Sequence, residues 1–393
     1  MYCAGAVAVA LQLDGVMTYI GENPVVAGGV ALAVVLVLFG LGYAVRRYLA
    51  SSGQQLARLL SRNDRVAVLM HPNPDPDAMS AALAVTSLAD QAGTDASVHY
   101  PGQIRHQENR AFETVLNLDF DRIESAAELP DAPVVLVDHN EARGFSGAEG
   151  IDPVAVVDHH PGGGEGSALT DVRVEYGACA SIFAEYFEEM GWEPVDPEEV
   201  STLEDTDGVL DPDVATGLLY GIQSDTKSLT KGCSPAEFEA SAYLYPGIDE
   251  DSLDRIANPE VDAEVLDIKA RAIDRRTVDK AFAVSDVGTV SNVDAIPQAA
   301  DELLRLEGVT AVVVFGDKDG TIHLSGRSRD DRVHMGKALR AVVDDVPMAG
   351  AGGHARMGGG QLSIEHMEGL GPSEGLSRGQ FEERLFTAMA GDL

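Results

Sequence analysis

A short loop between an apolar run and a run of small residues constrains this chain more than any other feature. Residues 66–70 (VAVLM) predict a buried strand, and residues 78–84 predict the start of a helix. The loop between them, HPNPDPD, carries His71, Asp75 and Asp77. Strand, loop and helix in this order are typical of α/β sheets, which present functional side chains at the carboxyl ends of their strands. A helix cap alone would account for one aspartate, but not for the imidazole and both carboxylates.

Residues that can ligate a metal also follow three further apolar segments. Segments 134–137 and 154–157 are strand-like, and segment 214–223 predicts a helix. Because the carboxyl ends of parallel strands share one edge of a sheet, these side chains can converge although they are far apart in sequence. Carboxylates in excess over imidazoles favour Mn²⁺, with Mg²⁺, Zn²⁺ or Co²⁺ as substitutes, and six ligands suffice for two cations about 3.5–4 Å apart. The residues that follow these segments are Asp138, Asp158, His159, His160 and Asp225.

The alternation of strand-like and helical segments predicts an α/β chain with a mostly parallel sheet and helices on both of its faces. The acidic, turn-rich stretch 246–260 predicts a hinge, and a second, smaller α/β set follows it. Within this second set, residues 349–360 (AGAGGHARMGGG) are so rich in glycine that we expect neither helix nor strand. We therefore expect an N-terminal segment (1–50), a first domain (51–250), and a linker with a second domain (251–393).

An uncharged stretch near the N-terminus predicts a transmembrane helix at about residues 24–45, since about twenty apolar residues can cross a bilayer. Arg46 and Arg47 follow it directly and no Lys or Arg precedes it, so the positive-inside rule predicts that the rest of the chain is cytoplasmic. A cleaved signal peptide fits less well, because its basic n-region is missing. A buried helix of a soluble protein is the other alternative. We expect a single-pass, membrane-anchored protein.

The charge balance limits the partners of this chain. There are 64 acidic and 28 basic residues, a net charge of -36, spread along the whole sequence. This balance fits a solvated, halophilic surface in a high-salt cytoplasm and disfavours duplex DNA as a partner. Phosphates can bind such a chain only through metals or local arginines. The three cysteines show neither a metal-binding spacing nor a disulfide framework.

The chain carries four motifs in this order: HPNPDPD, VLVDHN, VVDHH and GIQSDT. In these motifs and in their order it resembles the DHH superfamily of phosphoesterases, over roughly residues 63–390. The resemblance implies that Asp158 orients a metal ligand and that His160 faces the substrate phosphate, both as catalytic residues. It also implies two Mn²⁺ ions, with Asp138 and Asp225 bridging. The implied ligands are His71, Asp75, Asp138 and Asp225 for one ion, and Asp77, Asp138, His159 and Asp225 for the other.

The C-terminal part resembles the DHHA-type substrate-binding domain, whose signature is a glycine-rich loop ending in histidine. Such a loop lets backbone N–H groups approach a phosphate closely. The chain departs from the family pattern at Arg356 and Met357, where small residues are usual, and this affects the expected shape of the nucleotide pocket. The implied substrate-binding residues are Arg327, within SGRSR, and Gly352, Gly353 and His354.

These features favour a two-metal phosphodiesterase that uses a metal-activated hydroxide on short nucleotides: linear dinucleotides, very short oligoribonucleotides or cyclic dinucleotides. A manganese-dependent inorganic pyrophosphatase is the nearest alternative, since the run 138–141 (DHNE) is similar to that subfamily. A single-strand exonuclease and a non-catalytic nucleotide sensor are further alternatives. The expected partners are the short nucleotide and the membrane; a homodimer, the exact substrate and the role of residues 1–20 stay open.

Overall fold

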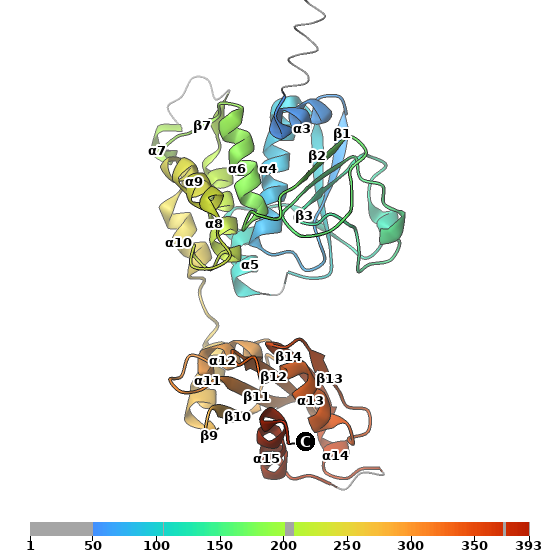
Figure 1. Ribbon diagram of the computed structural model, residues 1–393, viewed down its shortest axis with the longest axis vertical. Helices are drawn as coiled ribbons and strands as arrows, with labels where there is room; N and C mark the ends of the chain where they lie inside the picture. The colour runs from blue at the N-terminus through green and yellow to red at the C-terminus, as the bar shows by residue number, and fades with distance from the viewer. Residues whose placement is uncertain (1–49, 105, 201–207, 372–374, 393) are drawn as a thin grey trace, which may run out of the picture. The chain divides into compact units, whose positions relative to one another are not determined.

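The computed structural model describes residues 50–104, 106–200, 208–371 and 375–392. The chain divides after Pro259 into two compact units, called unit 1 and unit 2 (Glu260–Leu393) below (Figure 1). The predicted transmembrane helix at about 24–45 lies outside the described residues. Among the residues that are described, no helix is both long and apolar enough to cross a bilayer.

Unit 1 is built on a six-stranded sheet in the order β3-β2-β1-β4-β5-β6, and every neighbouring pair is parallel. The prediction of a parallel sheet is therefore confirmed. The chain runs outward from β1 to β3 and then returns to β4 beside β1, so the strand order reverses between β1 and β4, where α/β sheets bind ligands. The strands are β1 (Arg65–Leu69), β2 (Asp95–Pro101), β3 (Phe120–Ile123), β4 (Val134–Val137), β5 (Ala155–Asp158) and β6 (Leu169–Val172).

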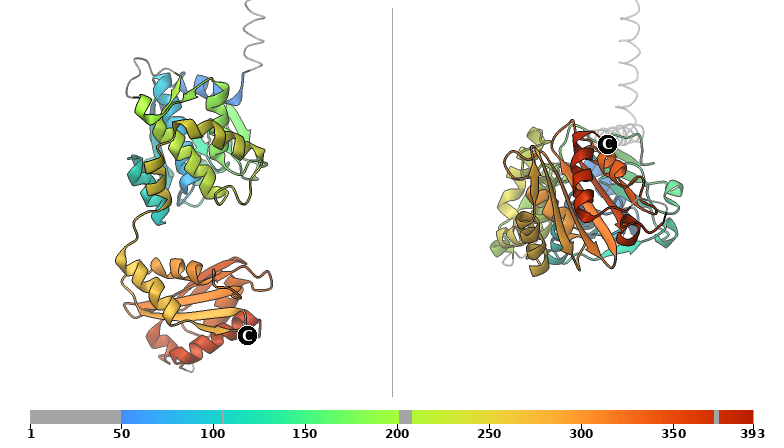
Figure 2. Two further views of the ribbon diagram at one scale, coloured as in Figure 1. Left: turned by 90° about the vertical axis from the view of Figure 1, so that its left-hand side faces the viewer. Right: turned by 90° about the horizontal axis from the view of Figure 1, so that it is seen from below.

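The helices of unit 1 cover mainly one face of this sheet (Figures 1 and 2). On that face Val66, Val68 and Met70 are buried against the helices. The other face carries a smaller cluster around Leu69 and Leu136 that packs against loop residues, so the expectation of helices on both faces is wrong for unit 1. The elements beside the sheet are α3 (Ser52–Leu60), α4 (Pro76–Ala92), α5 (Gln107–Val115), α6 (Cys179–Glu189), α7 (Pro197–Val200), α8 (Pro212–Asp225), α9 (Pro235–Leu244), α10 (Glu250–Ala257), three 3₁₀ turns (Ala126–Glu128, Ala148–Gly150 and Tyr245–Gly247), and a small ribbon of β7 (Glu193–Pro194) and β8 (Val209–Leu210).

The segment predicted as a hinge, 246–260, contains the division between the two units, after Pro259, but most of it is helical. Asp249 caps α10 by accepting a hydrogen bond from the backbone N–H of Ser252 at 3.1 Å. Ile256 of the same helix is fully buried in the core of unit 1. The acidic residues that suggested a hinge are therefore the first turn of an amphipathic helix, where they favour the helix N-terminus.

Unit 2 has a mixed six-stranded sheet in the order β13-β14-β12-β11-β10-β9, in which only β10 and β11 are parallel. Helices pack on both faces, one core lying toward α11 and α12 and the other toward α13 and α15. The elements are α11 (Ala263–Asp274), β9 (Thr277–Asp279), β10 (Phe282–Thr289), α12 (Ala295–Leu303), β11 (Ala311–Lys318), β12 (Thr321–Ser328), α13 (Met335–Val343), β13 (Gly350–Gly353), β14 (Met357–Ser363), α14 (Ile364–Met367) and α15 (Arg378–Ala390).

The glycine-rich stretch 349–360 was expected to be neither helix nor strand, and this expectation is wrong. It forms β13 and the first part of β14, which pair antiparallel. Glycine is needed here because β13 and α13 lie so close: a Cβ on Gly358 would be 2.9 Å from the carbonyl oxygen of Gly352 and 3.2 Å from the Cα of Gly336 in α13. A Cβ on Gly360 would likewise be 2.6 Å from the Cβ of Ala351. Close backbone packing overrides the low strand propensity of glycine.

Candidate active site

The loop after β1 delivers the first functional side chains. Asp75 is the N-cap of α4 and accepts a hydrogen bond from the backbone N–H of Ala78 at 3.1 Å. Its other oxygen, Oδ2, lies 3.7 Å from Nε2 of His71. The cap and the candidate ligand are therefore the same residue, and the two interpretations of the loop do not exclude each other.

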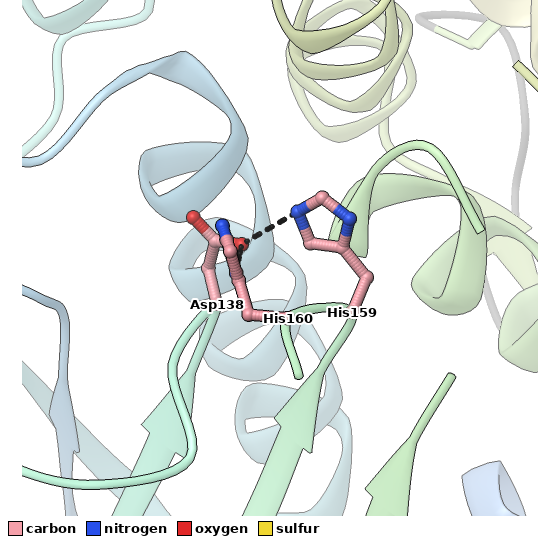
Figure 3. Close-up of side chains that lie close together, drawn as sticks. All are labelled: Asp138, His159 and His160. Carbon is pink, nitrogen blue, oxygen red and sulfur yellow. Dashed lines mark ion pairs between the residues drawn. The ribbon is translucent and has the colours of Figure 1, made fainter. Parts of the chain in front are cut away.

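Asp138 follows β4 directly and lies at the centre of the site. Its Oδ2 is 3.3 Å from Nε2 of His71, and its Oδ1 is 3.3 Å from Nε2 of His159. Figure 3 shows the Asp138 carboxylate beside the rings of His159 and His160. Because the two oxygens face different imidazoles, Asp138 joins two groups of side chains, as a bridging ligand must.

The first group consists of His71, Asp75 and Asp138, and the second of Asp77, His159 and Asp225. A further set of close ligand atoms, from Asp138, His159 and His160, connects the two groups. In the second group Nε2 of His159 is 3.6 Å from Oδ2 of Asp77 and 3.6 Å from Oδ2 of Asp225. The predicted ligands thus come together from the segments that follow β1, β4 and β5 and from the last residue of α8. Asp225, predicted to bridge both ions, groups here with Asp77 and His159.

The donor atoms in these groups fit divalent cations. Both carboxylate oxygens of Asp138 and Nε2 of His159 are buried and have no hydrogen-bond partner among the described residues. Buried polar atoms without partners are rare in folded proteins and point to an ion or water that completes them. The opposite ring nitrogens are held by backbone carbonyls: Nδ1 of His71 by Pro72 at 3.1 Å, and Nδ1 of His159 by Tyr176 at 3.2 Å. This arrangement orients each Nε2 lone pair as in histidine ligands of metals.

The charges at the site show the same need for cations. Burial lowers the pKa of His71, but the contacts with Asp138 and Asp75 outweigh it and raise that pKa to about 11. For His159, the contacts with Asp138 and Asp77 likewise outweigh burial and raise the pKa to about 10. Burial and the neighbouring Asp75 and Asp138 carboxylates raise the pKa of Asp225 to about 7. Without metals, protons would have to balance this cluster of carboxylates.

Asp77 has a structural role beside its place in the second group. It is fully buried, and its two oxygens accept hydrogen bonds from the backbone N–H groups of Cys179 at 2.7 Å and Ala180 at 2.8 Å. These N–H groups belong to the first turn of α6, where a carboxylate is favoured. Burial and the nearby Asp138 and Asp225 raise the pKa of Asp77.

Asp158 and His160 form a linked pair at the end of β5. Oδ1 of Asp158 accepts hydrogen bonds from Nδ1 of His160 at 3.0 Å and from the backbone N–H groups of His159 at 2.8 Å and His160 at 3.1 Å. Asp158 is fully buried, whereas the His160 side chain is 46% exposed. Nε2 of His160 has no hydrogen-bond partner among the described residues, so it is free to meet a substrate.

In unit 2 the predicted substrate-binding residues lie at two strands, β13 and β12, that are separated in the sheet by β14. Gly352 and Gly353 are the last residues of β13, and the exposed His354 follows them. Arg327, on β12, is largely engaged within unit 2: its Nε and one terminal nitrogen donate to Asp301 at 2.7 and 3.3 Å, and the other terminal nitrogen donates to Ser325 at 3.0 Å.

Sequence reasoning did not single out Asn140, Tyr176 or Arg340. A Cβ placed on Gly352 would be 3.4 Å from a terminal nitrogen of Arg340, which makes no side-chain hydrogen bond or ion pair within the described ranges. Asn140 carried a signal, since it ends the VLVDHN motif. Tyr176 acts through its backbone carbonyl, and nothing local in the sequence marks either Tyr176 or Arg340.

Two family models match the chain, and together they cover most of both units. The model "DHH family, N-terminal domain" matches residues 65–222, and the model "DHHA1 domain" matches residues 279–370. Fold, site and matches together define a chain in which a DHH domain with candidate metal ligands is followed by a DHHA1 domain. Residues 65–222 are the DHH part and residues 279–370 the DHHA1 part, the domain organisation of the DHH/DHHA1 superfamily.

Several known proteins are similar to this chain. An uncharacterized protein of Methanocaldococcus jannaschii is 34% identical over 312 residues, which are 79% of this chain and 60% of that protein. A cyclic-di-AMP phosphodiesterase of Geobacillus thermodenitrificans is 29% identical over 327 residues, which are 78% of this chain and 46% of that enzyme. The chain therefore spans about half the length of the curated relatives it matches. The crystal structure of an exopolyphosphatase-related protein from Bacteroides fragilis has the same fold, with a TM-score of 0.56 at 15% identity, and the match covers 86% of this chain and 96% of that one.

Proposed function

We propose that this chain is a Mn²⁺-dependent phosphodiesterase that hydrolyses short nucleotides, namely linear dinucleotides, very short oligoribonucleotides or cyclic dinucleotides. The observation that carries the proposal is the buried Asp138 carboxylate, whose unpartnered oxygens face His71 on one side and His159 on the other. One carboxylate shared by two ligand groups suits a pair of cations. The similarity to a cyclic-di-AMP phosphodiesterase over 78% of this chain supports the choice of substrate class.

The residues of unit 1 would hold two ions and contact a phosphate oxygen of the substrate. His71, Asp75 and Asp138 would hold one ion, and Asp77, His159 and Asp225 the other, with Asp138 shared. Two bound Mn²⁺ ions would supply an activated water molecule and neutralise the charge that develops on the phosphoryl oxygens. His160, fixed by Asp158 and half-exposed, would contact a phosphate oxygen through its Nε2.

Unit 2 would select the substrate. The N–H groups of the glycine-rich strand β13 and the side chain of His354 would bind the distal phosphate or the terminus of the nucleotide. Arg327 was assigned to this phosphate from its motif, and its pairing with Asp301 leaves it few free donors. Arg340, adjacent to Gly352 and without an ion pair among the described residues, is a second cation suited to the same phosphate.

Inorganic pyrophosphatase activity is the second candidate, favoured by the run Asp138–His139–Asn140–Glu141. The metal site alone would treat a phosphoanhydride and a phosphodiester alike, so the distinction depends on unit 2. The match of residues 279–370 to the DHHA1 domain favours the phosphodiesterase.

The test is a panel of substrates incubated with the protein and Mn²⁺: pyrophosphate, linear dinucleotides, cyclic dinucleotides and longer single strands. We expect hydrolysis of one or more of the dinucleotides and little turnover of pyrophosphate or long strands. Turnover of pyrophosphate alone would replace the proposal by the pyrophosphatase. Nucleotide binding without any turnover would make the protein a sensor.

A further inference from the structure

The turn that follows β4 is buried in an unusual way. Turns commonly lie on the surface, but the three residues Asp138, His139 and Asn140 are only 2%, 2% and 5% exposed. Asp138 also has a φ of 60°, in the left-handed region that side chains other than glycine adopt at a cost. A strained, buried turn that carries the central carboxylate of the site needs contacts that hold it in place.

Asn140 makes the contacts that reach from this turn to the next one. Its Nδ2 donates to Oδ2 of Asp158 at 2.6 Å and to the backbone carbonyl oxygen of His160 at 3.1 Å. Both amide hydrogens are therefore used, one by the last residue of β5 and the other by the turn that follows it. That turn carries His159 and His160, so Asn140 connects the turn of Asp138, after β4, to the turn of the two histidines, after β5.

Asp158 links Asn140 to the two histidines by hydrogen bonds. Its Oδ1 accepts from the backbone N–H groups of His159 and His160 and from the ring Nδ1 of His160, while Oδ2 receives Asn140. Neither oxygen is left to bind a metal or a substrate. Asn140 supplies the donor on the side of Asp158 that the histidines do not occupy, and the carboxylate is thereby fixed from both sides.

The glycine-rich loop at residues 161–166 (PGGGEG) closes over Asn140. A Cβ on Gly162 would be 2.0 Å from Oδ1 of Asn140, and a Cβ on Gly164 would be 1.8 Å from the Asn140 carbonyl oxygen. Only glycine allows the backbone to approach this closely. The loop keeps water away from the amide, and hydrogen bonds in such a place have a stronger effect than exposed ones. This packing gives a reason for a run of glycines that neither the metal site nor the substrate otherwise explains.

We infer that Asn140 is a positioning residue, which sets the separation of Asp138 from His159 and fixes the ring of His160 through Asp158. Asn140 itself belongs to neither ligand group. The inference rests on the proposed two-metal site. Partners that orient ligands commonly change metal affinity or activity by about 10–100-fold when they are removed, and Asn140 acts one contact farther out. We therefore expect about a tenfold effect.

The test uses the full chain with four changes: Asn140→Ala, Asn140→Asp, the exchange Asn140→Asp with Asp158→Asn, and Asn63→Ala. The last is the matched control, because Nδ2 of Asn63 donates to the carbonyl oxygen of Leu59 at 2.8 Å at the end of α3, apart from the site. Mn²⁺ affinity is measured by calorimetry, the melting temperature without metal by circular dichroism, and kcat and KM on the best dinucleotide.

We expect Asn140→Ala and Asn140→Asp to weaken Mn²⁺ binding and lower kcat about tenfold with KM little changed. The exchange variant should recover part of the Mn²⁺ affinity lost in Asn140→Asp, because donor and acceptor are swapped and their hydrogen bond is remade. Asn63→Ala should bind Mn²⁺ like the parent. If Asn140→Ala does not fold, Asn140→Ser takes its place in the same measurements.

A melting temperature lowered in Asn140→Ala with Mn²⁺ affinity and kcat at the parent level would overturn the inference, since Asn140 would then be structural only. An exchange variant that binds Mn²⁺ no better than Asn140→Asp would also overturn it. Failure of the proposed function has a different result: the parent itself would bind Mn²⁺ no more tightly than Asp138→Asn does.

Discussion

The substitution Asp138→Asn tests how far the site depends on one shared carboxylate. The change keeps the shape of the side chain and removes the charge and one acceptor from a residue that contacts both His71 and His159 at 3.3 Å. A metal present at about a hundredfold excess over its dissociation constant stabilises a protein by about 2.7 kcal/mol. For a unit of this size, that raises the melting temperature by roughly 5–10 °C per ion.

The assay is the melting temperature with and without Mn²⁺, so that any effect of the substitution on the metal-free protein cancels. We expect Asp138→Asn to lose most of the Mn²⁺-induced rise, because Asp138 is a member of the first group and its Oδ1 also faces His159 of the second. Asp75→Asn, which belongs to only one group, should lose about the share of one ion. The exposed Asp131→Asn serves as the control and should keep the full rise. An unchanged rise in Asp138→Asn would refute the shared-carboxylate reasoning.

Three further predictions concern the substrate, the fold and the membrane. Arg340→Ala should lower kcat/KM on dinucleotides roughly tenfold to a hundredfold and leave Mn²⁺ affinity unchanged, since a lost charge-assisted contact costs about 1.5–3 kcal/mol. Substitution of the exposed Arg305 by Ala is the control. Arg327→Ala in the same assay decides whether Arg327 also contacts phosphate. Arg173→Met should lower the free energy of unfolding by about 3 kcal/mol in urea titrations, because it leaves the largely buried Asp171 and the partly buried Glu185 without their cation. Contacts with Arg173 and Tyr186 outweigh burial and lower the pKa of Asp171. The parent should therefore lose this part of its free energy of unfolding as the pH falls below about 4, and Arg173→Met should lose less. An equal loss of stability in acid for both proteins would contradict this role of Arg173. The full-length protein should sediment with membranes and a chain starting at Ser51 should not, while both hydrolyse dinucleotides; a full-length protein that stays in the supernatant would reject the predicted anchor.

The sequence predicted which residues meet, because ligand-type side chains after several strands of a parallel sheet must share an edge. The strand pattern alone did not predict how they divide between two ions, and the expected division came from the family resemblance. The side of Asp138 that faces each histidine depends on a φ of 60° in its turn, which no local pattern reveals. The pairing of Arg327 with Asp301 was also out of reach, because these residues lie 26 positions apart on different elements. The glycine strands β13 and β14 were missed because their propensity is low and the close approach of α13 that favours them is a tertiary contact.

The role of Asn140 was hidden for a similar reason. Its motif was visible, but the acceptor on Asp158 lies 18 residues away and comes within 2.6 Å only when β4 and β5 pair. Local patterns identify the residue types that chemistry needs, whereas the contacts that orient those residues arise from the packing of neighbouring strands and loops.

The most direct test of the proposed two-metal site is the initial rate of dinucleotide hydrolysis by the full chain during a titration with Mn²⁺, measured beside Asp138→Asn and Asp225→Asn. We predict that the parent rate rises with Mn²⁺ and returns to background when a chelator removes the metal. Both variants should stay near background at Mn²⁺ concentrations that saturate the parent. Hydrolysis that does not depend on Mn²⁺, or parent-like turnover in either variant, would contradict the proposed two-metal site.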